Sequence, residues 1–164
     1  MYLVLDNIRS AHNVGTIFRT SDALSVEHLY LGGICPGPLD KYGLRNNKLC
    51  KVSLGSENTV AYSHESDLDA LISQLIDEGY LIVSLEINED SYDIYDFLKN
   101  SPEINLDKLV LVLGNEVEGI SKSILEKSHH VVHLPMGGLK ESLNVSVAYS
   151  IAAYTINFFS YLDR

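Results

Sequence analysis

The chain has no tryptophan and only two cysteines, Cys35 and Cys50. Neither cysteine belongs to a C-x-x-C motif, and neither has a histidine at the spacing of a zinc site. This pattern indicates two reduced thiols rather than a disulfide framework or a metal–thiolate centre. No uninterrupted apolar run approaches the roughly 20 residues that a membrane-spanning helix needs, and the N-terminus lacks the regions of a secretory signal. We therefore expect a cytoplasmic protein that does not contact a membrane.

Several widespread fingerprints are also missing. The sequence has no GxxxxGK[ST], no GxGxxG after a predicted strand and no GxSxG, which disfavours a P-loop, a standard dinucleotide-binding fold and an α/β-hydrolase. It has no HExxH either, and His129, His130 and His133 all lie on or beside one predicted strand. The sequence therefore predicts no metal site.

Positive charge is scarce and unevenly distributed. The chain has 12 Lys and Arg against 22 Asp and Glu, for a net charge of −10. Residues 1–51 carry six basic and four acidic side chains, residues 52–107 carry one and thirteen, and residues 108–164 carry five of each. This acidity argues against loose binding of nucleic acids, which depends on phosphate neutralisation. It does not exclude RNA that binds one local basic patch. The alternative for each cation of this patch is a solvated surface residue. The candidate patch consists of Arg9, His12, Arg19, Lys41, Arg45, Lys48 and Lys51.

The chain has 164 residues, 46% of them apolar, which predicts one domain over residues 1–164 with a sizeable core. Short apolar strands alternate with helices. Strands are expected at 2–5, 28–31, 80–87, 109–113 and 131–134, and helices from Asn13 as N-cap, over 68–76, over 121–127 and from 142 to 162. Continuous apolar strands separated by helices predict an α/β fold with a mostly parallel sheet covered on both faces.

Two connections are unusually long. Residues 34–47 form a predicted loop rich in glycine and proline, and loops of this length inside compact domains are often functional. Residues 88–102 form an acidic connection with a short strand or turn expected around 93–97.

The last helix carries two apolar stripes at helical spacing. One contains Leu143, Val147, Ile151, Tyr154, Phe158 and Leu162, and the other contains Val145, Ala148, Ala152, Ile156 and Phe159. Since a surface helix needs only one stripe, the pattern predicts burial from two sides, in the core or at an interface. Ser-Leu-Asn at 142–144 precedes this helix, where side-chain oxygens and free backbone N–H groups can meet a ligand.

Three segments together carry a family resemblance: NIRSAHNVGTIFRTSDA at 7–23, LVLVLGNEVEGIS at 109–121 and VHLPMGGLKESLNVSVAYSIA at 132–152. In this order they resemble the TrmH branch of the SPOUT superfamily of RNA methyltransferases. The resemblance implies a sheet whose C-terminal segment forms a deep trefoil knot. It also implies methylation of ribose 2′-hydroxyls with S-adenosylmethionine by a homodimer, which the doubly apolar last helix also favours. Transfer RNA is the first expected substrate, and ribosomal RNA is the next.

The resemblance transfers roles to individual residues. The implied catalytic residues are Arg19, Asn13, Ser142, Asn144 and Glu116. The implied cofactor-binding residues are Leu85, Gly114, Leu134, Met136, Ser142 and Leu143. Val117 departs from the glycine of many relatives. The chain resembles minimal members without a separate N-terminal RNA-binding domain, so RNA contacts are expected from this domain itself or from an accessory protein. The expected RNA-binding residues are Arg9, His12, Arg19, Arg45, Lys48 and Lys51.

An arginine is hardly ever neutral in a protein, so we expect Arg19 to clamp a phosphate and stabilise a developing alkoxide rather than act as a base. Loop 34–51 is expected to select the substrate, because it is long, locally basic and expected next to Arg19. Two other interpretations remain open at this point. One is a non-catalytic RNA-binding or assembly module on the same fold, and the other is a small-molecule α/β protein outside the family.

Overall fold

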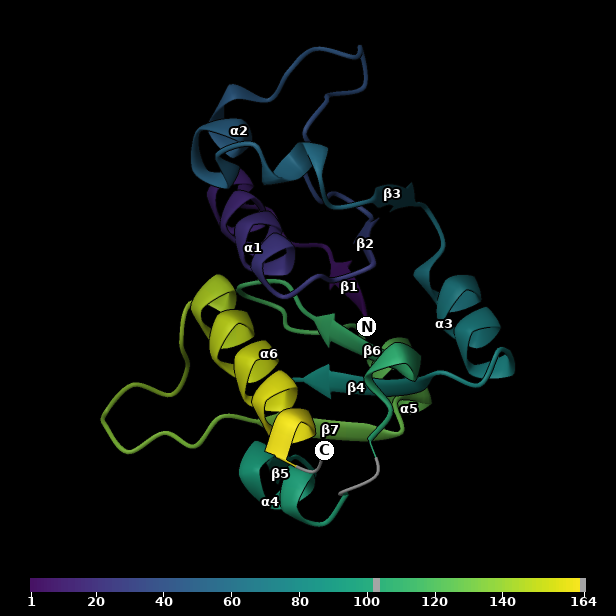
Figure 1. The fold of residues 1–164 in the computed structure, drawn as a ribbon, viewed down its shortest axis with the longest axis vertical. Coiled ribbons are helices and arrows are strands. Elements are labelled where there is room, and N and C mark those ends of the chain that lie inside the picture. Colours follow the sequence, from purple (N-terminus) through teal and green to yellow (C-terminus); the bar gives the residue numbers. More distant parts are fainter. Residues whose placement is uncertain (102–103, 163–164) are drawn as a thin grey trace.

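The computed structural model describes residues 1–101 and 104–162, with the backbone alone for 160–162. In this part of the chain seven strands form a single sheet in the order β3-β2-β1-β6-β4-β7-β5 (Figure 1). The strands are β1 (Tyr2–Asp6), β2 (His28–Gly32), β3 (Tyr62–Glu65), β4 (Leu81–Leu85), β5 (Tyr92–Asp93), β6 (Leu109–Leu113) and β7 (His130–His133). Every neighbouring pair runs parallel, so the predicted α/β class is confirmed and the sheet is parallel throughout.

A helix follows every strand except β4, which is followed directly by β5. The helices are α1 (Ala11–Ala23), α2 (Asn47–Ser53), α3 (Leu68–Asp77), α4 (Ile94–Lys99), α5 (Lys122–Lys127) and α6 (Val145–Leu162), with 3-10 turns η1 (Ser56–Asn58) and η2 (Leu106–Lys108). The helices pack on both faces, as the continuous apolar strands predict. The central strand β6 shows why: Leu109, Leu111 and Leu113 face the core with α1 and α6, whereas Val110 and Val112 face the core with α3 and α5.

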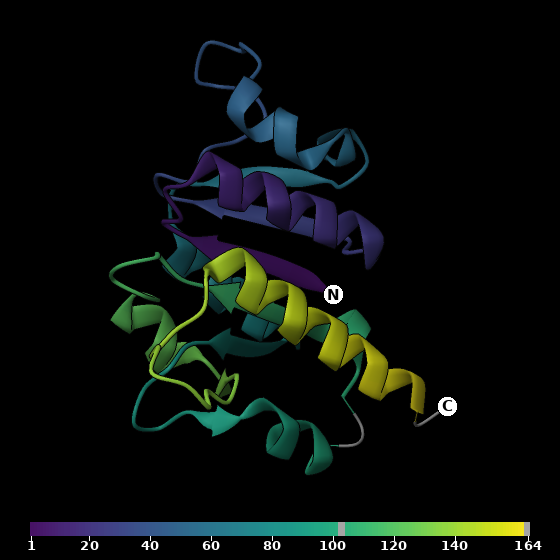
Figure 2. The same ribbon diagram turned by 90° about the vertical axis from the view of Figure 1, so that its left-hand side faces the viewer.

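Helices α1 and α6 lie side by side across one face of the sheet (Figure 2). Two hydroxyl pairs join them: Ser21 Oγ lies 2.8 Å from Tyr149 Oη, and Thr20 Oγ1 lies 2.9 Å from Ser150 Oγ. Tyr149 is fully buried, so its hydroxyl needs this partner. Burial raises the pKa of the phenol, which stays neutral.

Only one of the two predicted stripes on α6 is buried within the chain. Ala152 and Ile156 lie in the core, with Val145, Ala148 and Phe159 packed against it. The other stripe is 39–60% exposed at Leu143, Val147, Ile151, Tyr154 and Phe158. The expectation of burial from two sides therefore holds for one side within this chain, and Leu162 lies outside the described side chains.

The structure corrects several boundaries. Ser10, not Asn13, is the N-cap of α1, because Ser10 Oγ accepts from the backbone N–H of Asn13 at 3.2 Å. The short strand or turn expected around 93–97 is in part the strand β5, which ends at Asp93, and the rest is the helix α4. Asp93 caps α4 by accepting from Tyr95 N at 2.8 Å. Sequence patterns missed α2 and β3 altogether, because both are short and partly exposed. Pro102, at the end of the expected acidic connection, lies outside the described residues.

Candidate active site

A cavity of about 620 Å³ opens where strands β4, β6 and β7 end. Ligands commonly bind beyond the carboxyl ends of parallel strands. Three loops surround it, which start after Leu85, after Leu113 and after His133, and the first turn of α6 completes the wall. Its lining is Leu85, Glu86, Ile87, Leu113, Gly114, Asn115, Glu116, Val117, Gly119, His133, Leu134, Met136, Glu141, Ser142, Leu143, Asn144, Val145 and Ala148.

Backbone hydrogen bonds close the loop after β6 into a tight turn. Asn115 and Gly119 exchange two backbone hydrogen bonds of 3.0 Å. A Cβ on Gly114 would lie 2.3 Å from Gly119 C and from Ile120 N, so only glycine fits at position 114. Gly119 has φ +73°, which also favours glycine. Both glycines of the GNEVEGIS motif are therefore required by the turn itself.

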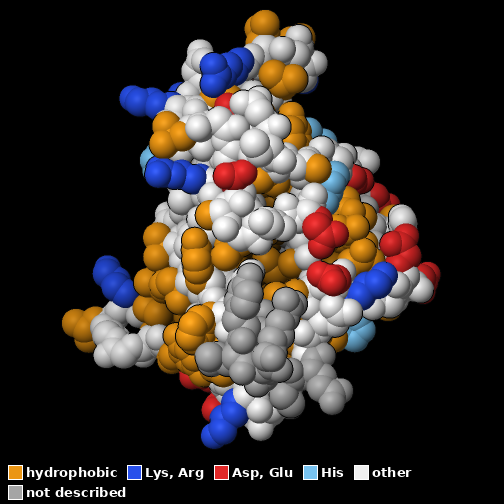
Figure 3. Space-filling model, in the orientation of Figure 1, with side chains coloured by type: hydrophobic (Ala, Val, Ile, Leu, Met, Phe, Trp, Pro, Cys, Tyr) orange, Lys and Arg blue, Asp and Glu red, His pale blue; other side chains and the backbone are white. Residues whose placement is uncertain are grey.

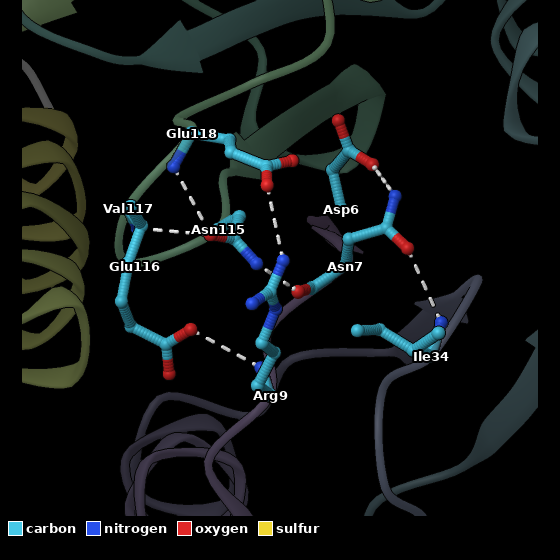
Figure 4. A network of polar contacts seen from close by, with 8 residues as sticks. All are labelled: Asp6, Asn7, Arg9, Ile34, Asn115, Glu116, Val117 and Glu118. Carbon is cyan, nitrogen blue, oxygen red and sulfur yellow. Dashed lines mark hydrogen bonds and ion pairs between the residues drawn. The ribbon is translucent and has the colours of Figure 1, made fainter.

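Asn115 is a site residue that the motif comparison did not single out. Its Oδ1 accepts from Val117 N at 2.9 Å and from Glu118 N at 3.1 Å, and its Nδ2 donates to Asn7 O at 2.7 Å (Figure 4). Its amide thus shapes the loop after β6 and fastens it to the loop after β1. An asparagine between two glycines is a turn signal, and this signal could have pointed to it.

The Glu116 carboxylate binds the loop after β1 and the first turn of α1. Oε2 accepts from Arg9 N at 3.1 Å, and Oε1 accepts from Ser10 N at 3.2 Å and from Asn13 Nδ2 at 2.9 Å. Partial burial raises the pKa of Glu116, but these hydrogen bonds outweigh that effect and the pKa lies below its usual value. Glu116 is therefore ionised at neutral pH.

Asn13 also forms a hydrogen bond with Asn144, at the start of the last helix. Its Oδ1 accepts from Asn144 Nδ2 at 3.1 Å, and Asn144 Oδ1 in turn accepts from Ser146 N at 3.0 Å and from Ser146 Oγ at 2.7 Å. Asn144 therefore caps α6 while it holds Asn13. Glu116, Asn13 and Asn144 form one hydrogen-bonded chain that joins the three motif segments.

Two further carboxylates hold the cavity together, and sequence patterns missed both. Asp6, 2% exposed at the end of β1, accepts from Ser121 N at 2.7 Å and from Asn7 Nδ2 at 2.8 Å. Glu86, after β4, accepts from Ile120 N at 2.9 Å and from Ile87 N at 3.0 Å, and it lines the cavity. Each follows an apolar strand, which is the only sequence signal they carry.

The residues expected to bind the cofactor all meet at this cavity: Leu85, Gly114, Leu134, Met136, Ser142 and Leu143. Of the residues expected to be catalytic, Glu116, Ser142 and Asn144 line it, and Asn13 contacts two of them. Arg19 does not join them. Arg19 is exposed on α1, and its side chain forms no hydrogen bond or ion pair with another described residue.

Two of the side chains expected to bind RNA form ion pairs within the chain. Arg9 Nη2 pairs with the exposed Glu118 at 3.1 Å, and Arg45 Nη2 pairs with the buried Glu57 at 3.3 Å. His12 on α1 and Lys48 and Lys51 on α2 are exposed. Lys and Arg side chains gather at the upper end of the molecule over α2 and the loop before it, whereas Asp and Glu gather around β3 and α3 (Figure 3).

The cavity suits S-adenosylmethionine in size and in chemistry. Its volume falls within the range of about 300–1,000 Å³ that is usual for small-ligand sites. Leucine and methionine side chains provide an apolar slot for an adenine ring. Glu86 and Glu141 provide acceptors for hydroxyl and ammonium groups and a negative field for a sulfonium cation. Within residues 1–101 and 104–162 no group of three or more His, Cys, Asp or Glu is placed to hold a metal ion, and no helix is long and apolar enough to cross a membrane.

Residues 1–154 match the SpoU rRNA Methylase family, and the chain belongs to this family. The resemblance drawn from the three motifs is thereby confirmed. The chain is 32% identical over 148 residues to a 23S rRNA (guanosine-2′-O-)-methyltransferase, RlmB, of Neisseria meningitidis, covering 90% of this chain and 54% of that protein. It is 31% identical over 154 residues to a TrmH family protein of Staphylococcus saprophyticus, covering 94% of this chain and 57% of that protein. The chain thus spans little more than half the length of these relatives.

Solved structures share the fold. The TrmH/SpoU tRNA modifying enzyme of A. aeolicus superposes with a TM-score of 0.80 at 28% identity, over 98% of this chain and 75% of that one. AviRb of Streptomyces viridochromogenes, in complex with the cofactor AdoMet, superposes with a TM-score of 0.80 at 22% identity, over 96% of this chain and 59% of that one. A structure concerned with the 2-OH methylation of C/U34 on tRNA gives a TM-score of 0.79 at 23% identity and is covered to 97% of its length.

Proposed function

We propose that this chain transfers a methyl group from S-adenosylmethionine to a ribose 2′-hydroxyl of RNA in the cytoplasm. The observation that carries the proposal is the hydrogen-bonded chain Glu116–Asn13–Asn144 at the mouth of the cavity. It joins three segments that are far apart in sequence, and it does so beside a cavity of suitable size. Family membership and relatives that methylate 2′-oxygens support the same reaction.

The cavity residues would bind the methyl donor, which supplies an electrophilic methyl group when it is bound. Leu85, Leu134 and Met136 would hold the adenine, and Glu86 would accept hydrogen bonds from hydroxyls of the adenosine ribose. Gly114 would act through the shape of its loop, since only glycine fits against the backbone of Gly119 and Ile120 there. A polar, partly enclosed wall of this kind orients the donor and excludes water.

Ser142 and Asn144 would orient the target ribose at the cavity mouth, and Asn13 and Glu116 would act as positioning residues. Glu116 binds backbone N–H groups and Asn13 with its two oxygens, so it is engaged in holding the loop after β1 rather than free to move a proton. Arg19 would bind the phosphate next to the target and stabilise the developing 2′-alkoxide. The proton would leave to water or to a phosphate oxygen.

We propose that the chain forms a homodimer through α6. The exposed stripe of Leu143, Val147, Ile151, Tyr154 and Phe158 runs along α6 from just before its start, and exposed apolar patches of this kind mark interaction surfaces. Thr20 on α1 contacts Ser150 on α6, so Arg19 is one residue away from the contact between these two helices. We propose that pairing through α6 brings Arg19 toward the site of the second copy, since Arg19 does not line the cavity of its own chain.

The proposed substrate is transfer RNA, with ribosomal RNA as the next choice. The A. aeolicus relative is a tRNA modifying enzyme, whereas the N. meningitidis relative modifies 23S rRNA. The proposed trefoil knot would involve residues 134–144, of which Leu134, Met136 and residues 141–144 line the cavity. A backbone trace in a crystal structure would test the knot directly.

The test of the reaction is incubation of the purified protein with labelled S-adenosylmethionine and total transfer RNA, and separately with ribosomal RNA. We expect label in a 2′-O-methyl nucleotide, mapped by its resistance to alkali. Methylation that requires a cell extract would indicate an accessory protein. Binding of the cofactor by calorimetry with no transfer to any RNA would instead identify a non-catalytic module that has kept the fold.

A further inference from the structure

The loop after β2 contains an ordered hairpin. Leu39 and Arg45 form an antiparallel bridge, and Asn46 N donates to Pro38 O at 2.8 Å. Asn46 also donates from its side chain to Gly37 O at 3.2 Å. The sequence predicts only an irregular loop here, but residues 37–46 are fixed by backbone and side-chain hydrogen bonds on both arms.

Asp40 closes the tip of this hairpin. Its Oδ1 accepts from Tyr42 N at 2.8 Å and from Leu44 N at 2.9 Å, and its backbone N–H donates to Leu44 O at 2.8 Å. Gly43 has φ +76°, a conformation that glycine adopts without strain. The Asp40 carboxylate is thus used inside the turn, and the backbone that carries Tyr42 is held in place.

Tyr42 projects from this tip with 75% of its surface exposed. Lys41 Nζ lies 5.0 Å from the centroid of its ring, in a cation–π contact. Residues 41–51 contain four Lys and Arg and no Asp or Glu, although the whole chain is acidic. The hairpin therefore presents a preorganised aromatic ring in the most basic surroundings that the sequence offers.

The hairpin is attached to the edge of the candidate active site. Ile34 N donates to Asn7 Oδ1 at 3.2 Å, and Ile8 N donates to Cys35 Sγ at 3.1 Å. These contacts fasten the start of the loop to the segment whose Arg9 amide binds Glu116 (Figure 4). The amide of Ser10 in the same segment binds Glu116 as well. At the far end, Arg45 pairs with Glu57, whose side chain is 4% exposed. Both ends of the hairpin are therefore anchored.

We propose that Tyr42 is a stacking platform for an unpaired base of the RNA substrate, with Lys41 on the adjoining phosphate. This inference rests on the proposed function, because it names the kind of RNA that the same site selects. Bases inside an A-form helix have no free face, whereas bases in loops and ends stack on aromatic side chains. A ring on a fixed turn loses little conformational entropy on binding. The enzyme would therefore select a target nucleotide in or next to a single-stranded segment.

The absence of tryptophan from the chain allows a direct test. Tyr42→Trp introduces a single tryptophan, whose fluorescence a stacked base quenches. We expect quenching by a single-stranded uridine oligonucleotide and little by an RNA duplex at the same phosphate concentration. Tyr95→Trp is the control, because Tyr95 is also exposed but lies on α4 between Asp93 and Asp96. Equal quenching by the duplex, or at position 95, would overturn the proposal.

Two variants separate stacking from charge and from folding. Tyr42→Ala should weaken binding of the uridine oligonucleotide by roughly tenfold or more, and Tyr42→Phe should bind as the wild type does. The exposed ring makes either change compatible with folding, which circular dichroism checks. Oligonucleotide affinity and RNA methylation that are unchanged in Tyr42→Ala would overturn this inference while leaving the proposed function intact. Quenching by the uridine oligonucleotide without any methyl transfer to RNA would support the stacking role of Tyr42 and overturn the proposed function. A shift of the Tyr42→Trp emission with protein concentration alone would assign Tyr42 to a contact between copies, and so refute the stacking role.

Discussion

Asn144 donates a hydrogen bond from its Nδ2 to the Oδ1 of Asn13 at 3.1 Å, across 131 positions of sequence. The same Asn13 donates from its own Nδ2 to Glu116 Oε1 at 2.9 Å. An amide is the side chain that can do both, since a carboxylate lacks the donor and a hydroxyl lacks the reach. Asn13 is only 7% exposed, so each of these groups depends on its protein partner.

Asn13→Asp should abolish most of the methyl transfer and lower the free energy of unfolding by about 1–3 kcal/mol, because it removes a buried donor and sets a second carboxylate beside Glu116. Urea denaturation and single-turnover methylation check the two effects. Asn47→Asp is the matched control, since Asn47 is exposed at the start of α2. Equal stability and activity of the two variants would contradict the role given to Asn13.

Arg19→Lys should lower kcat for RNA methylation by roughly 10- to 100-fold, because lysine keeps the charge but loses the planar fork that binds two phosphate oxygens. Binding of S-adenosylmethionine by calorimetry should be unchanged, since Arg19 does not line the cavity. Arg19→Ala provides the reference for complete loss. Near-wild-type turnover of the lysine variant would show that a point charge suffices and that no bidentate clamp exists.

Ile151→Glu should convert the proposed dimer to a monomer, because it places a charge in the middle of the exposed stripe of α6. Ile151 is 39% exposed in the single chain, so the change should leave the fold intact. Analytical ultracentrifugation at micromolar concentration compares it with Tyr92→Glu, an exposed aromatic on β5. A wild-type protein that sediments as a monomer, or an Ile151→Glu variant that remains a dimer, would exclude α6 as the interface.

Glu57 should contribute to stability against acid. Burial raises the pKa of its carboxyl, but hydrogen bonds from Ser53 and from backbone N–H groups outweigh that effect and bring the pKa to about 2. A glutamate in the unfolded chain has a pKa of about 4.3, so the unfolded chain takes up the proton first as the pH falls. The contribution is therefore fully present above about pH 5 and is lost between there and about pH 2, and it is on the order of 2–3 kcal/mol.

Glu57→Gln should accordingly be less stable than the wild type at pH 7 and should show a weaker loss of stability between pH 5 and pH 3. Urea midpoints at a series of pH values measure both. Glu118→Gln serves as the control, because Glu118 pairs with Arg9 on the surface and exposed pairs contribute little. Parallel pH profiles for the wild type and Glu57→Gln would refute the assignment.

Cys35 should resist thiol reagents in the folded protein. Burial raises the pKa of its thiol to about 12, so almost no thiolate exists at pH 8. Alkylation by iodoacetamide should be slow until urea unfolds the chain, when Cys35 and Cys50 should both react. Cys50→Ser isolates the signal of Cys35. Rapid alkylation of that variant under native conditions would show that the loop after β2 opens readily.

Apolar strands were the easiest elements to predict. Residues 109–113 form β6 with the bounds that the run LVLVL predicts, because a strand buried on both faces has no polar positions. Short elements with exposed faces, such as α2, gave no periodic signal. Asn13 was misassigned as an N-cap for a related reason: its residue type suits a cap, but its side chain is used by Glu116 and Asn144, which no local pattern reveals.

The candidate site was predicted in its membership more than in its roles. The residues that the family resemblance implies for cofactor binding all line one cavity, and their role stays a prediction. Asp6 and Glu86 were missed, because their function is to bind backbone N–H groups of a distant loop. The position of Arg19 outside the network could not be read from the motif either, since a motif records residue types and not which of them meet in space.

The uneven distribution of charge gives the molecule an electrical polarity. Basic side chains gather over α2 and its preceding hairpin, and acidic ones gather around β3 and α3 (Figure 3). An RNA backbone that approaches from the acidic side is repelled, and one that approaches from the basic side is drawn in. If RNA is the substrate, as proposed, these long-range forces would turn the polyanion before any contact forms, although the net charge of the chain is −10. Added salt would then lower the association rate constant, because it screens this long-range attraction.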